Sequence, residues 1–170
     1  MRPYRKDFSE VFALAVEIER KFLVDKRKLR GLEFLTEEKI SQGYLSTNPT
    51  VRVRLKDDRG FLTIKSRTKG ISRLEFEYEI PADDAKKLLR LCGRSVLKKY
   101  RRKVSYGGHI WEIDFFAGRH AGLILAEVEL KSADEVVEFP DWIAEEVSRD
   151  ERYFNSNLVK GDSPLRKPGR

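Results

Sequence analysis

The stretch that decides the fold is residues 50–67, TVRVRLKDDRGFLTIKSR. Basic and branched apolar residues alternate from Val51 to Lys56, and the alternation returns between Leu62 and Arg67. A period of two residues is typical of a β-strand with two different faces. The triplet Asp58-Arg59-Gly60 between the two runs is typical of a tight turn. The stretch therefore predicts two antiparallel strands that share one apolar face and one cationic face.

The same alternation extends along most of the chain. It predicts strands near residues 16–24, 40–47, 50–57, 60–67, 71–81, 96–106, 109–117 and 123–132. Apolar residues at helical spacing predict helices over residues 26–38, 82–92 and 140–148. We therefore expect an α+β fold, an eight-stranded antiparallel β-barrel with flanking helices.

The charges are segregated by sign along this pattern. Residues 52–73 contain eight bases and two acids, whereas residues 112–151 contain twelve acids and three bases. An ordinary antiparallel sheet would turn its charged faces to water and its apolar faces to the core. Such a sheet has no reason to repeat like charges at every second position, because like charges on one face repel. Since amphipathic helices are available to cover the apolar faces, we expect the charged faces to line the inside of a tunnel.

Composition excludes several classes of protein. The chain has 170 residues, which is the length of one ordinary domain. Its charged fraction of 37% is unusually high, and its net charge is +7. No apolar run approaches the ~18–20 residues of a membrane span, so we expect no membrane partner and a cytoplasmic location. Because the signs are mixed and segregated, we do not expect a nucleic-acid partner. Cys92, the single cysteine, is expected to be buried, and His109 and His120 fall in turns and are not expected to be ligands.

The two kinds of charge suit two parts of one ligand. The planar guanidinium groups of Arg52 and Arg54 match phosphate oxygens. The pairs Glu17/Glu19 and Glu127/Glu129 place two carboxylates on one face of a strand, and Mg²⁺ typically joins one or two carboxylates to a substrate phosphate. No glycine-rich phosphate loop is present, so phosphate recognition would rest on side chains.

Several motifs occur in the order found in one known family. They are Glu17-Ile18-Glu19-Arg20-Lys21, Gln42-Gly43-Tyr44-Leu45, Val51-Arg52-Val53-Arg54, Thr63-Ile64-Lys65, Arg73-Leu74-Glu75-Phe76-Glu77, Lys99-Tyr100-Arg101, residues 111–118, residues 122–130 and Arg152-Tyr153-Phe154-Asn155-Ser156-Asn157-Leu158. The first resembles the ExExK signature of the CYTH domain, or triphosphate tunnel metalloenzyme superfamily, and the last resembles the end of its bacterial single-domain members. The resemblance implies a CYTH domain over residues 13–160, an N-terminal extension over 1–12 and a flexible tail over 161–170.

The resemblance also implies roles for individual residues. Triphosphate would bind to Lys21, Arg52, Arg54, Lys65, Lys99 and Arg101. The ligands of Mg²⁺ or Mn²⁺ would be Glu17, Glu19, Asp114, Glu127 and Glu129, with Glu75 and Glu77 at a second metal. Tyr44 and Lys21 would be catalytic, Tyr44 orienting or deprotonating the attacking water, although a core aromatic role for Tyr44 is equally compatible with the sequence. Lys99 is preferred to Lys98 because it lies two residues before Arg101.

The function implied is a metal-dependent triphosphatase that acts on a small triphosphate or polyphosphate. Inorganic tripolyphosphate, hydrolysed to pyrophosphate and phosphate, is the leading substrate. A class IV adenylate cyclase and a thiamine or nucleoside triphosphatase remain alternatives within the same fold. A non-catalytic polyphosphate-binding module is the alternative from another class, and it would need the arginines but not the carboxylates. The sequence leaves the oligomeric state open.

Overall fold

The computed structural model describes residues 16–66, 72–161 and 164. The predicted N-terminal extension and nearly all of the predicted tail lie outside these residues. The strands are β1 (Val16–Val24), β2 (Thr36–Thr47), β3 (Thr50–Lys56), β4 (Arg59–Lys65), β5 (Ser72–Ile80), β6 (Val96–Tyr106), β7 (His109–Phe116), β8 (Ile124–Glu129) and β9 (Ile143–Glu146). The helices are α1 (Ala82–Leu91) and α2 (Asn155–Leu158), and 3₁₀ turns occupy Lys26–Leu29, Gly118–His120 and Glu151–Tyr153.

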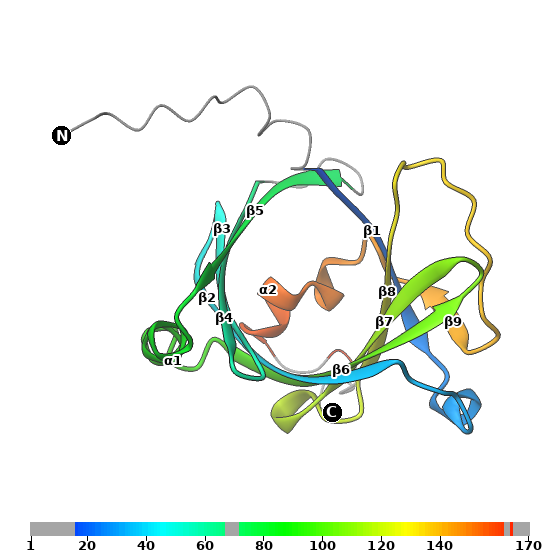
Figure 1. Cartoon of the computed structure of the whole chain (residues 1–170), viewed down its shortest axis with the longest axis horizontal. Coiled ribbons are helices and arrows are strands. Elements are labelled where there is room, and N and C mark those ends of the chain that lie inside the picture. The colour runs from blue at the N-terminus through cyan, green and yellow to red at the C-terminus, as the bar shows by residue number, and fades with distance from the viewer. Residues whose placement is uncertain (1–15, 67–71, 162–163, 165–170) are drawn as a thin grey trace, which may run out of the picture.

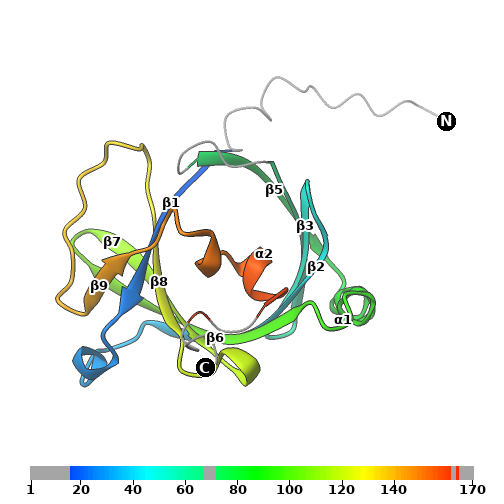
Figure 2. The same cartoon turned by 180° about the vertical axis from the view of Figure 1, so that it is seen from behind.

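The strands form one antiparallel sheet in the order β5-β4-β3-β2-β6-β7-β8-β1-β9. The sheet curves around a central space that contains α2, as both views show (Figures 1 and 2). Residues Val16–Ile18 of β1 also pair with β5, the strand at the other edge of the sheet. The described sheet thus has nine strands rather than the predicted eight. The pairing of β1 with β5 covers only three residue pairs, so a closed barrel remains a prediction.

Two of the three predicted helices are wrong. Residues 26–38 form only a short 3₁₀ turn, and β2 already begins at Thr36. Gly31, with φ 77°, interrupts any longer helix between them. Residues 140–148 contain β9, because the segment pairs with β1 there, Val24 opposite Ile143. Hydrogen bonds available from β1 therefore override the helical spacing of Trp142, Ile143 and Val147.

The third predicted helix, α1, covers the outer face of β2–β4 (Figure 1). Two strand glycines allow this close approach, as a glycine in a strand often does. A Cβ on Gly43 would lie 2.7 Å from Cys92 Sγ, and a Cβ on Gly60 would lie 2.8 Å from Ala85 Cβ. Cys92 is buried in this contact, as predicted, and burial raises the pKa of its thiol.

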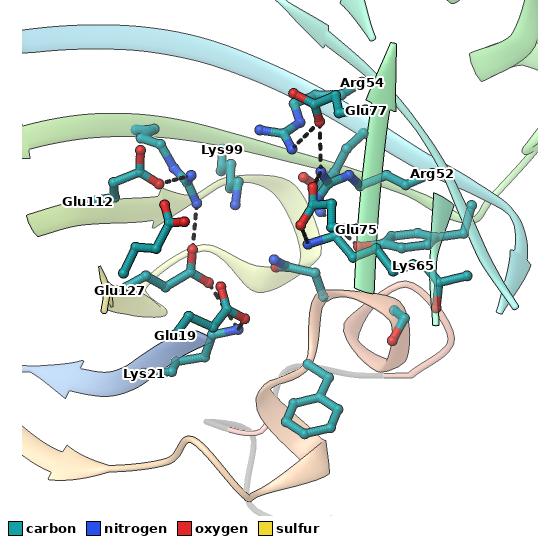
Figure 3. Close-up of a pocket in the computed structure, with 18 of the residues that line it drawn as sticks. Glu19, Lys21, Arg52, Arg54, Lys65, Glu75, Glu77, Lys99, Glu112 and Glu127 are labelled. Carbon is teal, nitrogen blue, oxygen red and sulfur yellow. Dashed lines mark hydrogen bonds and ion pairs between the residues drawn. The ribbon is translucent and has the colours of Figure 1, made fainter. Parts of the chain in front are cut away.

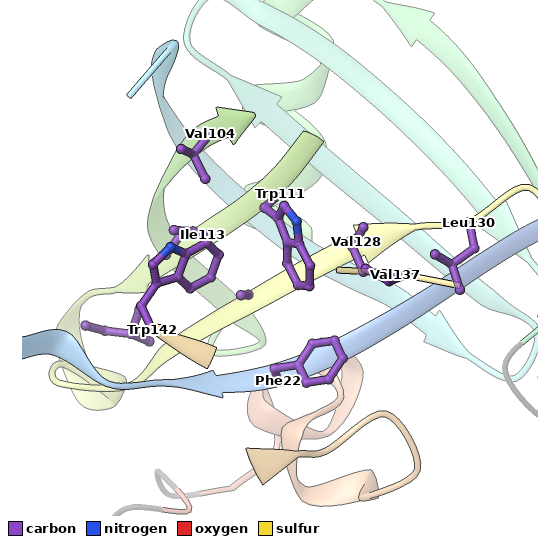
Figure 4. Close-up of a cluster of buried hydrophobic side chains, with 10 residues drawn as sticks. Phe22, Val104, Trp111, Ile113, Val128, Leu130, Val137 and Trp142 are labelled. Carbon is purple, nitrogen blue, oxygen red and sulfur yellow. The ribbon is translucent and has the colours of Figure 1, made fainter. Parts of the chain in front are cut away.

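The outer apolar face of β1, β7 and β8 is covered by the irregular segment before β9 instead of by a helix. Phe22, Trp111 and Trp142 meet there, with Val137 and Leu130 at the edge of the same cluster (Figure 4). The rings of Trp111 and Trp142 lie edge to face, with centroids 5.5 Å apart. Within the described residues, no helix has the length and apolarity needed to cross a membrane.

A second apolar cluster lies inside the curve of the sheet, where α2 packs. Its members include Leu97 of β6, Leu125 of β8 and Leu123 just before β8. The C-terminal segment contributes Val147, Tyr153, Leu158 and Val159. These buried residues hold α2 in place. The rest of the inner face is charged, and this is where the candidate site lies.

Candidate active site: a charged cavity inside the sheet

A cavity of about 480 Å³ lies on the inner face of the sheet. This is within the ~300–1,000 Å³ usual for small-molecule sites. Among the residues whose side chains the structure describes, seven cations and six carboxylates contribute to its wall. They are Lys21, Arg52, Arg54, Lys65, Lys99, Arg101 and Lys103, and Glu19, Glu75, Glu77, Glu112, Glu127 and Glu129. The charged faces of the strands therefore point inward, as the sequence analysis predicted.

All six side chains predicted to bind triphosphate lie on this wall. Alternation explains their placement, because residues two apart on a strand share a face. Lys99 is buried and Lys98 is exposed, so the continuous register of β6 puts Lys99 on the inside with Arg101. Tyr44 and five of the predicted metal ligands also line the cavity: Glu19, Glu75, Glu77, Glu127 and Glu129.

On the side formed by β3, β4 and β5, two carboxylates are surrounded by cations (Figure 3). Lys65 Nζ lies 2.5 Å from Glu75, and Arg52 lies 3.5 Å from the same carboxylate. Arg52 and Arg54 both approach Glu77, at 3.2 and 3.3 Å. Burial alone would raise the pKa of Glu77. The charge of Arg54 and the hydrogen bond from Thr63 outweigh burial, so the pKa of Glu77 is lowered.

The two arginines of β3 also repel one another. Burial, and then the charge of Arg52, lower the pKa of Arg54 to about 10. The Nε atoms of both guanidinium groups are buried and have no hydrogen-bond partner within the described part of the chain. Buried donors without acceptors cost free energy, so this side of the cavity is ready to accept anionic oxygens.

On the opposite side, β1, β6, β7 and β8 build a second ionic cluster. Arg101 binds Asp114 at 2.7 Å through Nε, binds Glu127 at 2.7 Å and contacts Glu112. Lys21 lies 2.9 Å from Glu127. Burial opposes ionisation of Glu127, but Lys21 and Arg101 hold its pKa well below the usual range. Burial, and then Arg101, lower the pKa of Lys99 to about 8.

Asp114 differs from the other predicted metal ligands. It is fully buried behind the cavity wall, where it binds Lys99 and both Nε and Nη2 of Arg101. The geometry therefore makes Asp114 a residue that holds two cations in position. The side chain of Glu17 lies outside the described part of the structure, although its backbone pairs with Arg73.

The carboxylates of β1, β7 and β8 face one another across the strands. Glu19 is the direct partner of Glu129, and Glu112 is the direct partner of Glu127. Acidic residues directly opposite one another are destabilising unless a cation lies near them. Within the described ranges, no cluster of three or more acidic, histidine or cysteine side chains forms a metal site by itself. The donors do fit a hard cation such as Mg²⁺, which needs one or two carboxylates and takes its other ligands from phosphate and water.

Several cavity residues were missed by the sequence analysis. Gln42 is a buried cavity residue and donates from Nε2 to Tyr44 Oη at 3.1 Å. Thr63 does not line the cavity itself, but its hydroxyl donates to the cavity residue Glu77 at 2.7 Å. Alternation could have indicated both residues, because each lies two positions before a predicted site residue and so shares its face of the strand. Ser148, Phe154, Asn155 and Ser156 come from the C-terminal segment, where alternation gives no guide.

The histidines lie elsewhere. His120 is buried against the Leu158 carbonyl, and His109 pairs with Glu135 at 2.9 Å. Glu79 pairs with Arg59 at 2.7 Å, and neither residue lines the cavity.

Comparison with known proteins gives relatives along nearly the whole described chain. An inorganic triphosphatase of Acetivibrio thermocellus is 44% identical over 151 residues, which cover 85% of this chain and 93% of that protein. An inorganic triphosphatase of Nitrosomonas europaea is 39% identical, covering 84% and 96% of the two chains. A crystal structure of an inorganic triphosphatase superposes with a TM-score of 0.65 at 32% identity, covering 86% of this chain and 96% of that one. The CYTH domain model matches residues 15–160, so the chain belongs to the CYTH domain family.

Proposed function

We propose that the protein is an inorganic triphosphatase that hydrolyses tripolyphosphate to pyrophosphate and phosphate in the charged cavity. The names of its relatives support the reaction, and the charge of the wall supports the site. The seven cations of the wall are nearly matched by its six carboxylates. A binding site for a bare polyanion would show a large cationic excess. A nearly neutral wall instead suits a polyanion that arrives together with divalent cations.

For this reaction we propose that the sheet acts as a closed eight-stranded tunnel with β9 outside it. The pairing of Val16–Ile18 with β5 supports this arrangement. In this arrangement the apolar cluster around Leu158 would close one end, and substrate would enter at the other. Water excluded from the closed end would strengthen the electrostatic interactions inside.

The six basic residues would hold the triphosphate. Charged donors come from four strands: Lys21 from β1, Arg52 and Arg54 from β3, Lys65 from β4, and Lys99 and Arg101 from β6. The buried Nε donors of Arg52 and Arg54 would gain acceptors from phosphate oxygens. Each hydrogen bond to a charged group contributes roughly 1.5–3 kcal/mol. In-line attack on a terminal phosphoryl group builds charge on its oxygens and on the leaving pyrophosphate, where these cations would stabilise it.

The carboxylates would hold Mg²⁺ or Mn²⁺. Glu19, Glu127 and Glu129 remain the proposed ligands of one ion, with Glu17 beside them, and Glu75 and Glu77 those of a second. A bound divalent ion supplies neutralisation of phosphate charge and polarisation of the phosphoryl oxygens. We assign Asp114 a positioning role, because Lys99 and Arg101 occupy its oxygens and it does not line the cavity. Glu127 also binds two cations, but it lines the cavity and can exchange them for a metal ion.

Tyr44 with Lys21 remains the proposed pair that orients the attacking water. The hydrogen bond from Gln42 supports a positioned hydroxyl, since it fixes the direction in which Tyr44 Oη can itself donate. The packing of Tyr44 in the inner apolar cluster equally fits a structural part in closing the tunnel.

The test is phosphate release from tripolyphosphate, ATP and thiamine triphosphate with Mg²⁺, with Mn²⁺ and with a chelator. We expect equimolar pyrophosphate and phosphate from tripolyphosphate, and no product with the chelator. Formation of cyclic AMP from ATP as the main activity would replace this proposal by the cyclase alternative.

A matched pair of adjacent arginines tests the cavity itself. Arg101→Ala removes a cation of the wall, whereas Arg102→Ala removes one that stacks on Phe34 and Phe115 outside the cavity. We expect a loss of kcat/KM of at least about tenfold for the first variant and less than about twofold for the second. Equal effects would show that the reaction takes place elsewhere.

A further inference from the structure

Asn155 is a cavity residue that no strand supplies. It begins α2, which the buried side chains of Leu158 and Val159 hold inside the curve of the sheet (Figure 2). The Asn155 side chain lies on the cavity wall beside Phe154 and Ser156. The position of Asn155 is therefore fixed by the packing of its neighbours and not by its own polar group.

The carboxamide of Asn155 has no structural partner among the described residues. Its Oδ1 is buried and accepts no hydrogen bond. Asn157, two residues later, is the opposite case, because its Nδ2 donates to the Glu151 carbonyl at 3.0 Å and it does not line the cavity. A buried acceptor without a donor destabilises a fold, so packing alone would favour an apolar side chain at position 155.

We propose that Asn155 is a substrate-binding residue whose Nδ2 donates to the phosphoryl group of the triphosphate nearest α2. The inference rests on the proposed function, since it places the reacting triphosphate in this cavity. The cationic side chains of the wall already form ion pairs with carboxylates, at 2.5–3.8 Å for Lys21, Arg52 and Lys65. Lys99 pairs with Asp114 in the same way. A neutral amide donor adds phosphate recognition without disturbing the balance of charge. It also makes the C-terminal segment part of the binding site, so that substrate binding and the closing of the tunnel depend on each other.

The experiment compares Asn155→Leu, Asn155→Asp and the matched control Asn157→Leu, using tripolyphosphate with Mg²⁺ and thermal melting of each variant. We expect Asn155→Leu to lose roughly 10- to 100-fold in kcat/KM, as for loss of a hydrogen bond to a charged group. Its Tm should equal or exceed that of the wild type, because a buried acceptor without a donor is removed. Asn155→Asp, of nearly the same shape, should lose more, because its carboxylate repels phosphate. Asn157→Leu should lower the Tm and leave kcat/KM per folded molecule within about twofold.

A Tm at or above the wild type with kcat/KM within about threefold for Asn155→Leu would overturn the proposal. If Asn155→Leu does not fold, Asn155→Ser and Asn155→Ala are compared instead. Serine keeps a hydrogen-bond donor and alanine does not, so Asn155→Ser should retain more activity. Equal activity of these two variants would overturn the proposal. Arg101→Ala is measured in parallel. An effect of Arg101→Ala without one of Asn155→Leu would reject only the role of Asn155, whereas no effect of either would reject the cavity as the reaction site.

Discussion

Arg52 joins the two carboxylates on the β3–β5 side of the cavity, so its removal would affect the fold as well as phosphate binding. From the sequence, loss of Arg52 should relieve repulsion with Arg54 and leave stability unchanged or slightly higher. In the structure Arg52 also binds Thr63, Glu75 and Glu77, so its removal would leave two carboxylates with fewer partners. Alternation predicts which face a residue occupies, but it does not show which opposite charge lies beside it.

We therefore predict that Arg52→Ala lowers stability as well as activity. The free energy of unfolding should fall by about 1–3 kcal/mol, because Glu75 and Glu77 lose a charged donor while Lys65 and Arg54 remain. The values of kcat and kcat/KM should fall together, as for a phosphate-binding group used in the transition state. Urea unfolding and steady-state kinetics measure both. A rise in stability would restore the interpretation based on repulsion between the two arginines.

The residues that could be predicted are those carried by regular strands. Lys99 was separated from Lys98 by counting two residues back from Arg101, and the uninterrupted register of β6 made that count valid. Alternation also places Asp114 on the inner face of β7. It binds Lys99 and Arg101 there, however, and does not line the cavity. Asn155 could not be predicted from alternation, because its placement depends on the fold of the irregular C-terminal segment.

At the scale of elements, the strands were predicted well and the helices poorly for one physical reason. A strand with two different faces leaves a period of two in its own sequence. The segment around Trp142 has apolar residues at helical spacing although it is not a helix. Trp142, just before β9, packs in the outer cluster, and Val147, just after β9, packs in the inner cluster. The partner that fixes this segment is the edge of β1, which local sequence cannot reveal.

The contact between α1 and β2 gives a prediction at this scale. Gly43→Ala would place a Cβ 2.7 Å from Cys92 Sγ and 2.8 Å from Cys92 Cβ, so α1 must shift. We expect a loss of about 1–3 kcal/mol in the free energy of unfolding, the usual cost of overpacking. Gly161→Ala, where no atom lies within 4 Å, is the control and should change stability by less than about 0.5 kcal/mol. Comparable unfolding curves for the two variants would mean that α1 does not pack as described.

The segment that covers the outer face is tied to β7 by a pH-sensitive pair. The hydrogen bond to Glu135 raises the pKa of His109, and the Gly107 carbonyl adds to it. A raised pKa means that the stabilisation is complete below the unfolded value of about 6.5 and is lost as the pH rises through the higher folded value.

Thermal melting of the wild type and of His109→Asn from about pH 5 to about pH 8 tests this pair. The wild type should have the higher Tm at the acidic end, and the difference should shrink toward the alkaline end. A difference that stays constant, or that grows with pH, would show that protonated His109 does not hold the segment.

At the scale of the whole molecule, the net charge of +7 is a poor guide to the site. The seven cations and six carboxylates of the cavity nearly cancel, so most of the excess lies elsewhere. What the sequence did reveal was the segregation of signs, because each strand carries mainly one sign on its inner face and the sheet brings the strands together. The position of α2 inside the curve of the sheet was not foreseeable, since it depends on the C-terminal segment turning back into the sheet.

This balance predicts how the cavity binds its ligands. A polyphosphate alone would compete with the carboxylates for the cations, and a divalent cation alone would compete with the cations for the carboxylates. Bound together, each satisfies the groups that the other releases, so their effects on stability should be cooperative. We expect Mg²⁺ and imidotriphosphate, an analogue with P–N–P links that resists hydrolysis, to raise the Tm together by more than the sum of their separate shifts.

Glu127→Gln provides the variant that decides the cause. It removes one carboxylate that now binds Lys21 and Arg101, and so makes the cavity wall more cationic. The analogue alone should therefore raise the Tm of Glu127→Gln more than that of the wild type, while the extra shift from Mg²⁺ should shrink. Additive shifts in the wild type, or an unchanged response of Glu127→Gln to the analogue alone, would mean that charge balance does not govern binding in this cavity.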